Sequence, residues 1–226
     1  MTDPIQRMEG LIGAWGPDDR RTLFATAYAT MTTNMLGALG SGTFVDDDWV
    51  ERLLHRFADY YFDAVDAYAA APSGCPGPWC RAFDASGDHD LHPLRTLLLG
   101  INAHINYDLV FTLRDVLEPW DALDPSAREA RRRDHESVND VIRATVDAVQ
   151  DGVVAPVAPE MGVLDRLLGP VDEWAFSALI ADWRSDTWVD AVALLEAPPA
   201  DRAAIEWRIE RRALAVADRL AGSGAR

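Results

Sequence analysis

Residues 97–111 read Leu97-Leu98-Leu99-Gly100-Ile101-Asn102-Ala103-His104-Ile105-Asn106-Tyr107-Asp108-Leu109-Val110-Phe111, and this stretch decides the fold. Wound into a helix, its apolar side chains would cover nearly the whole circumference instead of one stripe. A helix without a polar face is normally surrounded by other elements of the fold. We therefore expect residues 93–120 to form one helix at the centre of the protein.

Amphipathic helices are expected on both sides of this central segment. Apolar residues recur there every three or four positions, which is the helical period, and no convincing alternation typical of a strand is present. Asp46 offers an N-cap for one helix, and Pro125 suits the first turn of another. The sequence predicts one all-α domain over residues 1–226, a bundle of about six main helices at 18–39, 49–70, 93–120, 124–150, 171–196 and 201–220. Residues 71–92, rich in Pro and Gly, are expected to form a long loop.

The charged residues exclude several kinds of function. The chain of 226 residues carries 21 cationic side chains against 37 acidic ones, a net charge of −16, and every cation is an arginine. Without lysine, a Schiff base, a pyridoxal-phosphate anchor and a Walker-type phosphate loop are excluded. The acidic balance argues against nucleic acid as a partner. Because no apolar run is long enough to span a bilayer and the first residues do not resemble a signal peptide, we expect a cytoplasmic protein without membrane contact.

Two cysteines, Cys75 and Cys80, lie in the expected loop. In a reducing compartment free thiols are favoured over a disulfide across so short a segment. His89 and His92 could complete a zinc site with them only by coincidence, because zinc ligands normally come as tighter pairs.

The central segment also carries four hydrogen-bonding side chains in an otherwise apolar context. His104 and Asp108 are one helical turn apart and share a face, while Asn102 and Asn106 share another. Buried polar groups must be paired, so one interpretation is a structural network that ties this helix to its neighbours. The other is a functional site in which His104 is a general base or a metal ligand and Asp108 orients it or shares the ion.

Further candidates lie in other expected helices. His135 and Asn139 form a second pair one turn apart on a core-directed face. Arg184, between two tryptophans, either stacks on them or turns inward to pair with Asp108 or to hold a ligand carboxylate. His55 lies on a face with several aspartates that reads as solvated.

The string Asn102-Ala103-His104-Ile105-Asn106-Tyr107-Asp108-Leu109 resembles the characteristic string of a bacterial all-helical family catalogued only as a domain of unknown function. Other pieces match its pattern in order. They include Phe24 with Tyr28 and Thr32, Phe57-Ala58 with Tyr61, Pro78-Trp79, Val138-Asn139, and Arg184 with Trp188. The resemblance implies that His104, Asn106 and Asp108 are the distinctive polar residues of the family, and it brings no established activity.

These observations favour a small-molecule enzyme with an interior pocket, of the isomerase, cyclase or hydrolase type. His104 and Asp108 would transfer a proton, Asn106 and Arg184 would assist, and a small, largely apolar ligand would contact further residues. These expected contacts are Asn102, His135, Asn139 and Tyr28. Two alternatives stay open: a non-catalytic helical module that binds a ligand or a protein, and an enzyme with a metal bound by His104 and Asp108. No cofactor is predicted, and the oligomeric state is open, with a homodimer among the alternatives.

Overall fold

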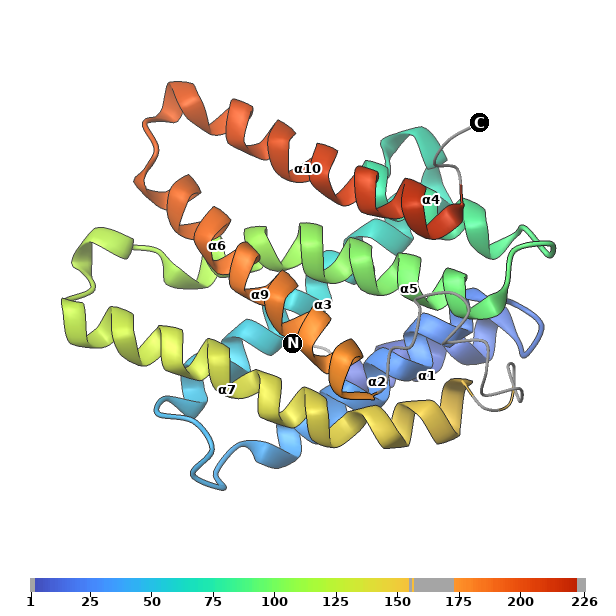
Figure 1. Ribbon diagram of the computed structural model, residues 1–226, viewed down its shortest axis with the longest axis horizontal. Coiled ribbons are helices and arrows are strands. Elements are labelled where there is room, and N and C mark those ends of the chain that lie inside the picture. Colours follow the sequence, from blue (N-terminus) through green and yellow to red (C-terminus); the bar gives the residue numbers. More distant parts are fainter. Residues whose placement is uncertain (1–2, 155, 157–172, 223–226) are drawn as a thin grey trace.

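The computed structural model describes residues 3–154, 156 and 173–222, and this part of the chain is all-α, as predicted (Figure 1). It contains nine α-helices and no strand. Single turns of π-helix occur at His104–Asp108 and Gln150–Val154, and short 3₁₀ turns at Pro72–Gly74 and Trp120–Ala122. The α-helices are α1 (Pro4–Trp15), α2 (Arg21–Ala38), α3 (Asp47–Ala70), α4 (Gly77–Ser86), α5 (Pro93–Ala103), α6 (Leu109–Leu117), α7 (Pro125–Val149), α9 (Glu173–Glu196) and α10 (Pro199–Ala221).

Helix α1 was missed by the prediction, which placed the first helix at 18–39. Asp3 caps it, since a carboxylate oxygen accepts a hydrogen bond from the Ile5 amide at 2.9 Å. Pro4 occupies the first turn, where its missing amide hydrogen costs nothing. The pair Asp3-Pro4 therefore marks the start of a helix. Met8 of this helix is fully buried.

The expectation of a loop over 71–92 was wrong, because α4 occupies the middle of that range. Pro78 lies in the first turn of α4 and so begins the helix instead of breaking it. Trp79 is 1% exposed, which shows that this short helix belongs to the core. With α1 and α4 added and the central segment divided, the count of about six main helices was too low.

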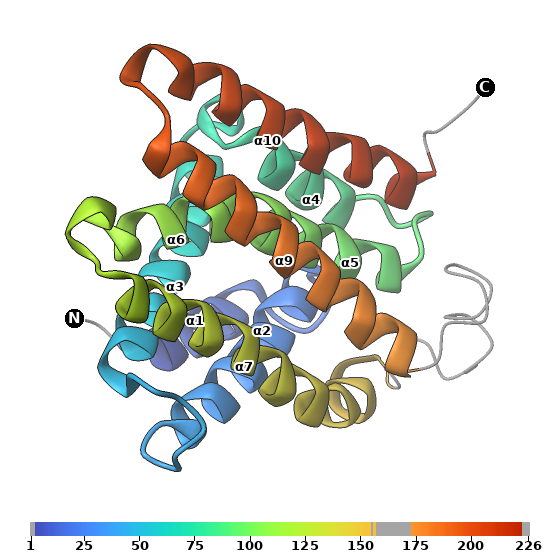
Figure 2. The same ribbon diagram turned by 60° about the vertical axis from the view of Figure 1, so that its left-hand side comes forward.

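The central position of the segment after Pro93 is confirmed. Helix α5 contacts α2, α4 and α10, and α6 contacts α3 and α9. In Figures 1 and 2 the two central helices run between α10 on one side and α7 on the other, with α9 crossing over them. The helix ends at Leu117, three residues before the expected end. For the helix expected at 171–196, the structure shows α9 from Glu173 onward, and residues 171–172 lie outside the described residues.

Between α5 and α6 the helix is not regular, and this departs from the prediction of one uninterrupted helix. Residues His104–Asp108 form a π turn, in which the Leu109 amide bonds to the His104 carbonyl five residues earlier. Single π turns inside α-helices are rare and are frequently found at functional sites. This turn coincides with the polar string.

Gly100 allows α2 to approach α5 closely. A Cβ atom at this position would lie 2.8 Å from two ring atoms of Phe24, closer than real Cβ contacts. Phe24 is buried and packs against Tyr61 and Trp79, with ring centroids 5.1 and 5.3 Å away. The glycine thus permits an aromatic cluster to form directly beside the π turn.

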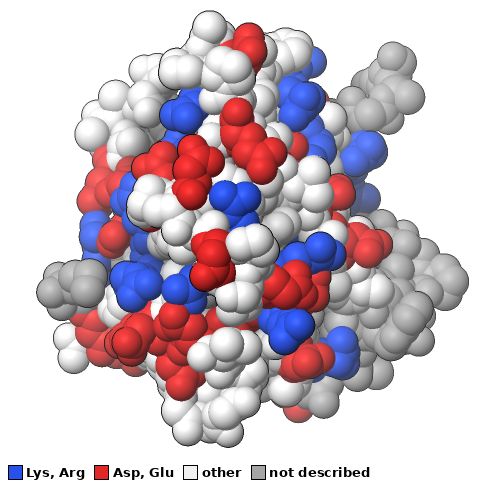
Figure 3. Space-filling model, turned by 90° about the vertical axis from the view of Figure 1, so that its left-hand side faces the viewer, with Lys and Arg blue, Asp and Glu red and all other residues white. Residues whose placement is uncertain are grey.

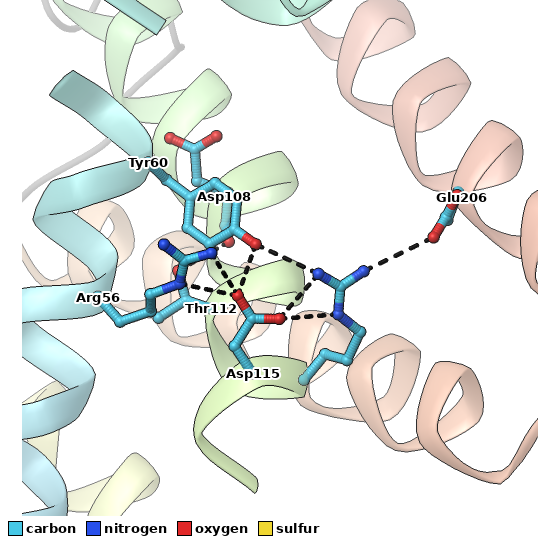
Figure 4. A network of polar contacts seen from close by, with 7 residues as sticks. Arg56, Tyr60, Asp108, Thr112, Asp115 and Glu206 are labelled. Atoms are coloured by element: carbon cyan, nitrogen blue, oxygen red, sulfur yellow. Dashed lines mark hydrogen bonds and ion pairs between the residues drawn. The ribbon is translucent and has the colours of Figure 1, made fainter. Parts of the chain in front are cut away.

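A polar network fixes the far end of α6 (Figure 4). Asp115 accepts hydrogen bonds from Arg56 and Tyr60 of α3, both at 2.8 Å, and from Arg114, which also reaches Glu206 of α10. Burial acts to raise the pKa of Asp115, but these hydrogen bonds outweigh it, and the pKa lies below its usual value. The network joins three helices at the surface and is separate from the central cavity described below.

The charge of the chain lies on its solvated surfaces. Figure 3 shows arginine and acidic side chains interspersed over one face of the molecule instead of gathered into patches of one sign. Among the described residues, three large hydrophobic side chains are exposed: Val45 at 65%, and Val189 and Trp207 at 64% each. None of the helices in the described ranges is long and apolar enough to cross a membrane.

Candidate functional site

An interior cavity of about 190 Å³ lies where six helices meet. Its walls come from α2, α3, α5, α6, α7 and α9 together with both π turns, and most lining residues are aliphatic or aromatic. A cavity of roughly 150 Å³ with similar walls accommodates benzene, so this one has room for a small organic molecule. The polar lining residues are Tyr28, Thr32, His104, Thr145, Gln150 and Arg184.

His104 lies in the wall of this cavity, enclosed by aromatic rings. The residue is 3% exposed, and its imidazole stacks on Phe57 with ring centroids 3.5 Å apart and planes inclined by 6°. Tyr28 contacts the imidazole edge-on at 4.4 Å, and the rings of Phe24 and Trp79 lie farther out, at 5.6 and 6.0 Å. The apolar surroundings disfavour a charged imidazolium, and burial lowers the pKa of His104 well below its usual value.

Asp108 orients this imidazole. Its Oδ2 atom lies 3.0 Å from His104 Nδ1 and accepts a second hydrogen bond from the Trp79 indole N–H at 2.8 Å. Burial raises the pKa of Asp108 well above its usual value, while the bond from Trp79 acts in the opposite direction. Because the indole N–H can only donate, Oδ2 acts as an acceptor, and we assign the His104 ring proton to Nδ1, which then donates to the same oxygen.

With Nδ1 committed, the other nitrogen of His104 is available to a ligand. Nε2 is buried and forms no hydrogen bond with any described residue. The hydroxyls of Tyr28 and Thr32, one turn apart on α2, also line the cavity, and apart from an interaction with each other they have no hydrogen-bond partner among the described residues. Burial raises the pKa of Tyr28 well above its usual value, and the charge of Asp108 adds to the increase, so this phenol keeps its proton. A buried imidazole nitrogen without a partner, beside two hydroxyls with spare hydrogen-bonding capacity in the wall of one apolar cavity, indicates a ligand site.

Asn102 and Asn106 lie away from the cavity, since neither is among its lining residues. The Asn106 amide donates to Asn102 Oδ1 at 2.9 Å, and the Asn102 amide donates to the Ala213 carbonyl of α10 at 3.0 Å. Both side chains are hydrogen-bonded at the contact between the central helix and α10. The polar string is thus divided: one face is the structural network, and the other face, with His104 and Asp108, meets the cavity wall.

Arg184 turns inward, as one expectation had it, but its partner is not Asp108. Its Nε donates to Asn139 Oδ1 at 2.8 Å, and its Nη2 donates to the His135 carbonyl at 2.7 Å and lies 3.2 Å from His135 Nδ1. His135 Nε2 in turn donates to the Arg184 carbonyl at 3.0 Å. Asp108 already bonds to Trp79 and His104. The partners of the Arg184 guanidinium, His135 and Asn139, belong to α7 and not to the central helix. The predicted pair on α7 is therefore the support of Arg184.

The remaining candidates do not join the site. His55 and His92 are partly exposed and His89 is exposed, and His92 Nδ1 accepts from the Leu94 amide at the start of α5. Cys75 and Cys80 are free thiols. Within the described ranges, no group of three or more His, Cys, Asp or Glu side chains could hold a metal ion. Among the described residues, His104 and Asp108 are bonded to each other, and no further His, Cys, Asp or Glu side chain joins them in such a group.

Two residues that position His104 were not identified from the sequence as site residues. Phe57 appeared there only among the pieces that match the family pattern, although it covers the imidazole face. Trp79, the second donor to Asp108, lay in the expected loop. Recognising Pro78 as a helix start would have made Trp79 a core residue, but nothing in the spacing predicts which carboxylate its indole meets.

Comparison with known proteins identifies a family whose function is not known. The model of the family of unknown function DUF5995 matches residues 1–223. No curated protein and no solved structure matches the chain. The chemistry of the site must therefore be argued from its own residues.

Proposed function

Because the chain belongs to a family of unknown function (DUF5995), we propose its activity from the cavity alone: it is an enzyme that binds a small, largely apolar molecule and transfers a proton within it. His104 is the general base, and Asp108 orients it. The observation that carries this proposal is the buried His104 Nε2, which has no partner among the described residues while Nδ1 is bonded to a carboxylate.

The arrangement suits proton abstraction in an apolar environment. A neutral imidazole is ready to accept a proton at neutral pH, and the low pKa of His104 keeps it neutral. Once Nε2 takes a proton, the ring becomes an imidazolium whose Nδ1–H points at the Asp108 carboxylate. The face of Phe57, stacked at 3.5 Å, adds a favourable interaction with that cation. The charge that develops on the ring is therefore stabilised by groups already in place.

Tyr28 and Thr32 can donate hydrogen bonds to the negative charge that forms on the substrate. Their hydroxyls have no hydrogen-bond partner in the described chain other than each other, and both residues line the cavity beside His104. A substrate that loses a proton to His104 gains negative charge, most stably on an oxygen. Hydroxyl donors aimed at such an oxygen lower the energy of the charged intermediate. The phenol of Tyr28 stays protonated and can donate.

Among the reaction types considered, isomerisation fits best. One base that removes a proton from carbon and returns it to another atom of the same molecule changes no composition and needs no water. Hydrolysis would need an ordered water and further polar partners, whereas the cavity walls are mostly apolar. We therefore favour an isomerase, with a cyclisation started by the same proton transfer as its variant.

A direct test uses 5-nitrobenzisoxazole, a neutral aromatic molecule that reports on bases in apolar cavities. Removal of the proton on its C3 breaks the N–O bond and releases a coloured cyanonitrophenolate. We expect the protein to accelerate this reaction and His104→Gln to reduce the rate by at least about 100-fold. His55→Gln is the matched control, because it makes the same change outside the cavity and should leave the rate unchanged.

Thermal unfolding of both variants shows whether they fold, and ligand-observed NMR shows whether the reagent binds. A wild-type protein that binds 5-nitrobenzisoxazole without accelerating its opening would contradict the proposal and favour the non-catalytic binding module. A folded His104→Gln protein with the wild-type rate would also refute the role of His104.

A further inference from the structure

Arg184 is a buried cation that has no anionic partner among the described residues. The residue is 4% exposed, yet its guanidinium forms no ion pair with any carboxylate of the described chain. Its nitrogens Nε and Nη2 bond to the Asn139 side chain and the His135 carbonyl, and Nη1 bonds to no described residue. Other arginines, such as Arg21, Arg56 and Arg131, pair with aspartates at the surface.

His135 cannot supply the missing negative charge. Its Nε2 donates a proton to the Arg184 carbonyl, and its Nδ1 faces the donor Nη2, so the ring must be the neutral form protonated at Nε2 alone. Burial lowers the pKa of His135 well below its usual value, and the charge of Arg184 adds to this effect. His135 and Asn139 therefore hold the guanidinium in one orientation without neutralising it.

A charge removed from water needs a partner of opposite sign or a polar environment. Burial lowers the pKa of Arg184 to about 9, which still leaves the guanidinium charged at neutral pH. Arg184 is also part of the cavity wall, whose other members are mostly apolar. The guanidinium is held in a fixed position in the cavity wall, and its Nη1 is available to donate hydrogen bonds to a ligand. Proteins commonly bind carboxylates through an arginine presented in this way.

We propose that the cavity binds a small organic carboxylate, whose anionic head group pairs with Arg184 and whose apolar body fills the space beside His104. This inference rests on the proposed function in one respect: the bound molecule is taken to be the one that gives its proton to His104. It adds a substrate class, a monoanion with a compact hydrocarbon or aromatic body.

The dimensions support a single molecule that meets both residues. Arg184 lies on α9 and His104 on the π turn, and these two elements contact each other while both face the cavity. A volume of about 190 Å³ corresponds to roughly one substituted benzene ring or a short alkyl chain. Long-chain fatty acids are too large for it.

The test compares two ligands of nearly equal shape, 3-phenylpropanoate and 3-phenylpropan-1-ol, by isothermal titration calorimetry at neutral pH. We expect the wild-type protein to bind the acid at least about tenfold more tightly than the alcohol, since a hydrogen bond to a buried charge outweighs one between neutral groups. In Arg184→Gln this preference should disappear. In Arg184→Lys, which keeps the charge but not the fork of donors, part of it should persist.

The 5-nitrobenzisoxazole reaction separates this inference from the proposed function. That reagent carries no carboxylate, so its opening by the wild-type protein reports on the base at His104. We expect 3-phenylpropanoate to inhibit this wild-type reaction competitively and 3-phenylpropan-1-ol to inhibit it at least about tenfold more weakly. Equal affinity for acid and alcohol, binding of neither, or an acid preference that survives in folded Arg184→Gln would each overturn the inference while leaving the base at His104 untouched. Should Arg184→Gln not fold, the wild-type and Arg184→Lys affinities decide the question.

Discussion

Replacing Asp108 with asparagine should slow proton transfer while leaving the protein folded. One carboxylate oxygen accepts both N–H groups, at 2.8 Å from the Trp79 indole and 3.0 Å from His104 Nδ1. An amide oxygen in the same place can keep both bonds and the same tautomer of His104. What Asp108→Asn removes is the negative charge beside the imidazolium that forms during the reaction.

The expected magnitude follows from the difference between charged and neutral hydrogen bonds. A bond to a charged group contributes about 1.5–3 kcal/mol and a neutral one about 0.5–1.5 kcal/mol. The barrier should therefore rise by about 1–2 kcal/mol, which corresponds to a rate about 5- to 30-fold lower. The free energy of unfolding should change by less than about 2 kcal/mol. Asp108→Asn removes the cost of burying a charge, which stabilises the folded protein, but it buries an amide N–H group without an acceptor, which destabilises it by a similar amount.

Asp108→Ala is the matched control for stability. It leaves the N–H groups of Trp79 and His104 buried without an acceptor, at about 1–3 kcal/mol each, so the protein should lose about 2–6 kcal/mol. The assay is kcat/KM for 5-nitrobenzisoxazole, together with urea unfolding of all three proteins. If Asp108→Asn is as fast as the wild type, or as unstable as Asp108→Ala, the carboxylate does not support the base and the reasoning is refuted.

Three further predictions concern stability. Gly100→Ala should cost about 1–3 kcal/mol, since its Cβ would meet the Phe24 ring at 2.8 Å; an unchanged urea midpoint would contradict this packing. His135 should lower the free energy of unfolding by about 1 kcal/mol between pH 7 and pH 5.5. Its pKa in the folded protein is low, so only the unfolded chain takes up a proton below about pH 6.5. His135→Gln should lose this component, and an unaltered pH dependence in that variant would count against the prediction. Asp115→Asn should lower the free energy of unfolding by about 1–2 kcal/mol at neutral pH, and by less as the pH falls towards the lowered pKa of the Asp115 carboxylate. A difference from wild type that does not shrink in acid would show that it does not come from the charge of Asp115.

The all-α fold could be predicted because apolar spacing reports directly on helices. The segment around His104 was identified as central from its lack of a polar face, and the spacing of four predicted its pairing with Asp108. The helix α4 was missed because Pro78 was taken as a breaker, although proline is favoured in a first helical turn. Composition alone cannot distinguish these two uses of proline.

The partners of the buried charges could not be predicted for a different reason. Whether Arg184 meets Asp108 or Asn139 depends on how α7 and α9 rotate about their axes, and side-chain spacing within one helix carries no information on that rotation. The π turn likewise follows from the fit of the central helix to its neighbours. Sequence periodicity therefore located the candidate residues, while the packing of separate helices decided which of them share the cavity.

The protonation of the His104 ring tests the central claim most directly. In protein labelled with ¹⁵N-histidine, long-range ¹H–¹⁵N correlation spectra distinguish a nitrogen that carries hydrogen from one that does not. We predict a neutral His104 with its proton on Nδ1 and a bare Nε2 at neutral pH, and the opposite form for His135, whose bonds require a proton on Nε2. A His104 ring that is protonated at Nε2 would have no lone pair for a substrate proton and would contradict the account.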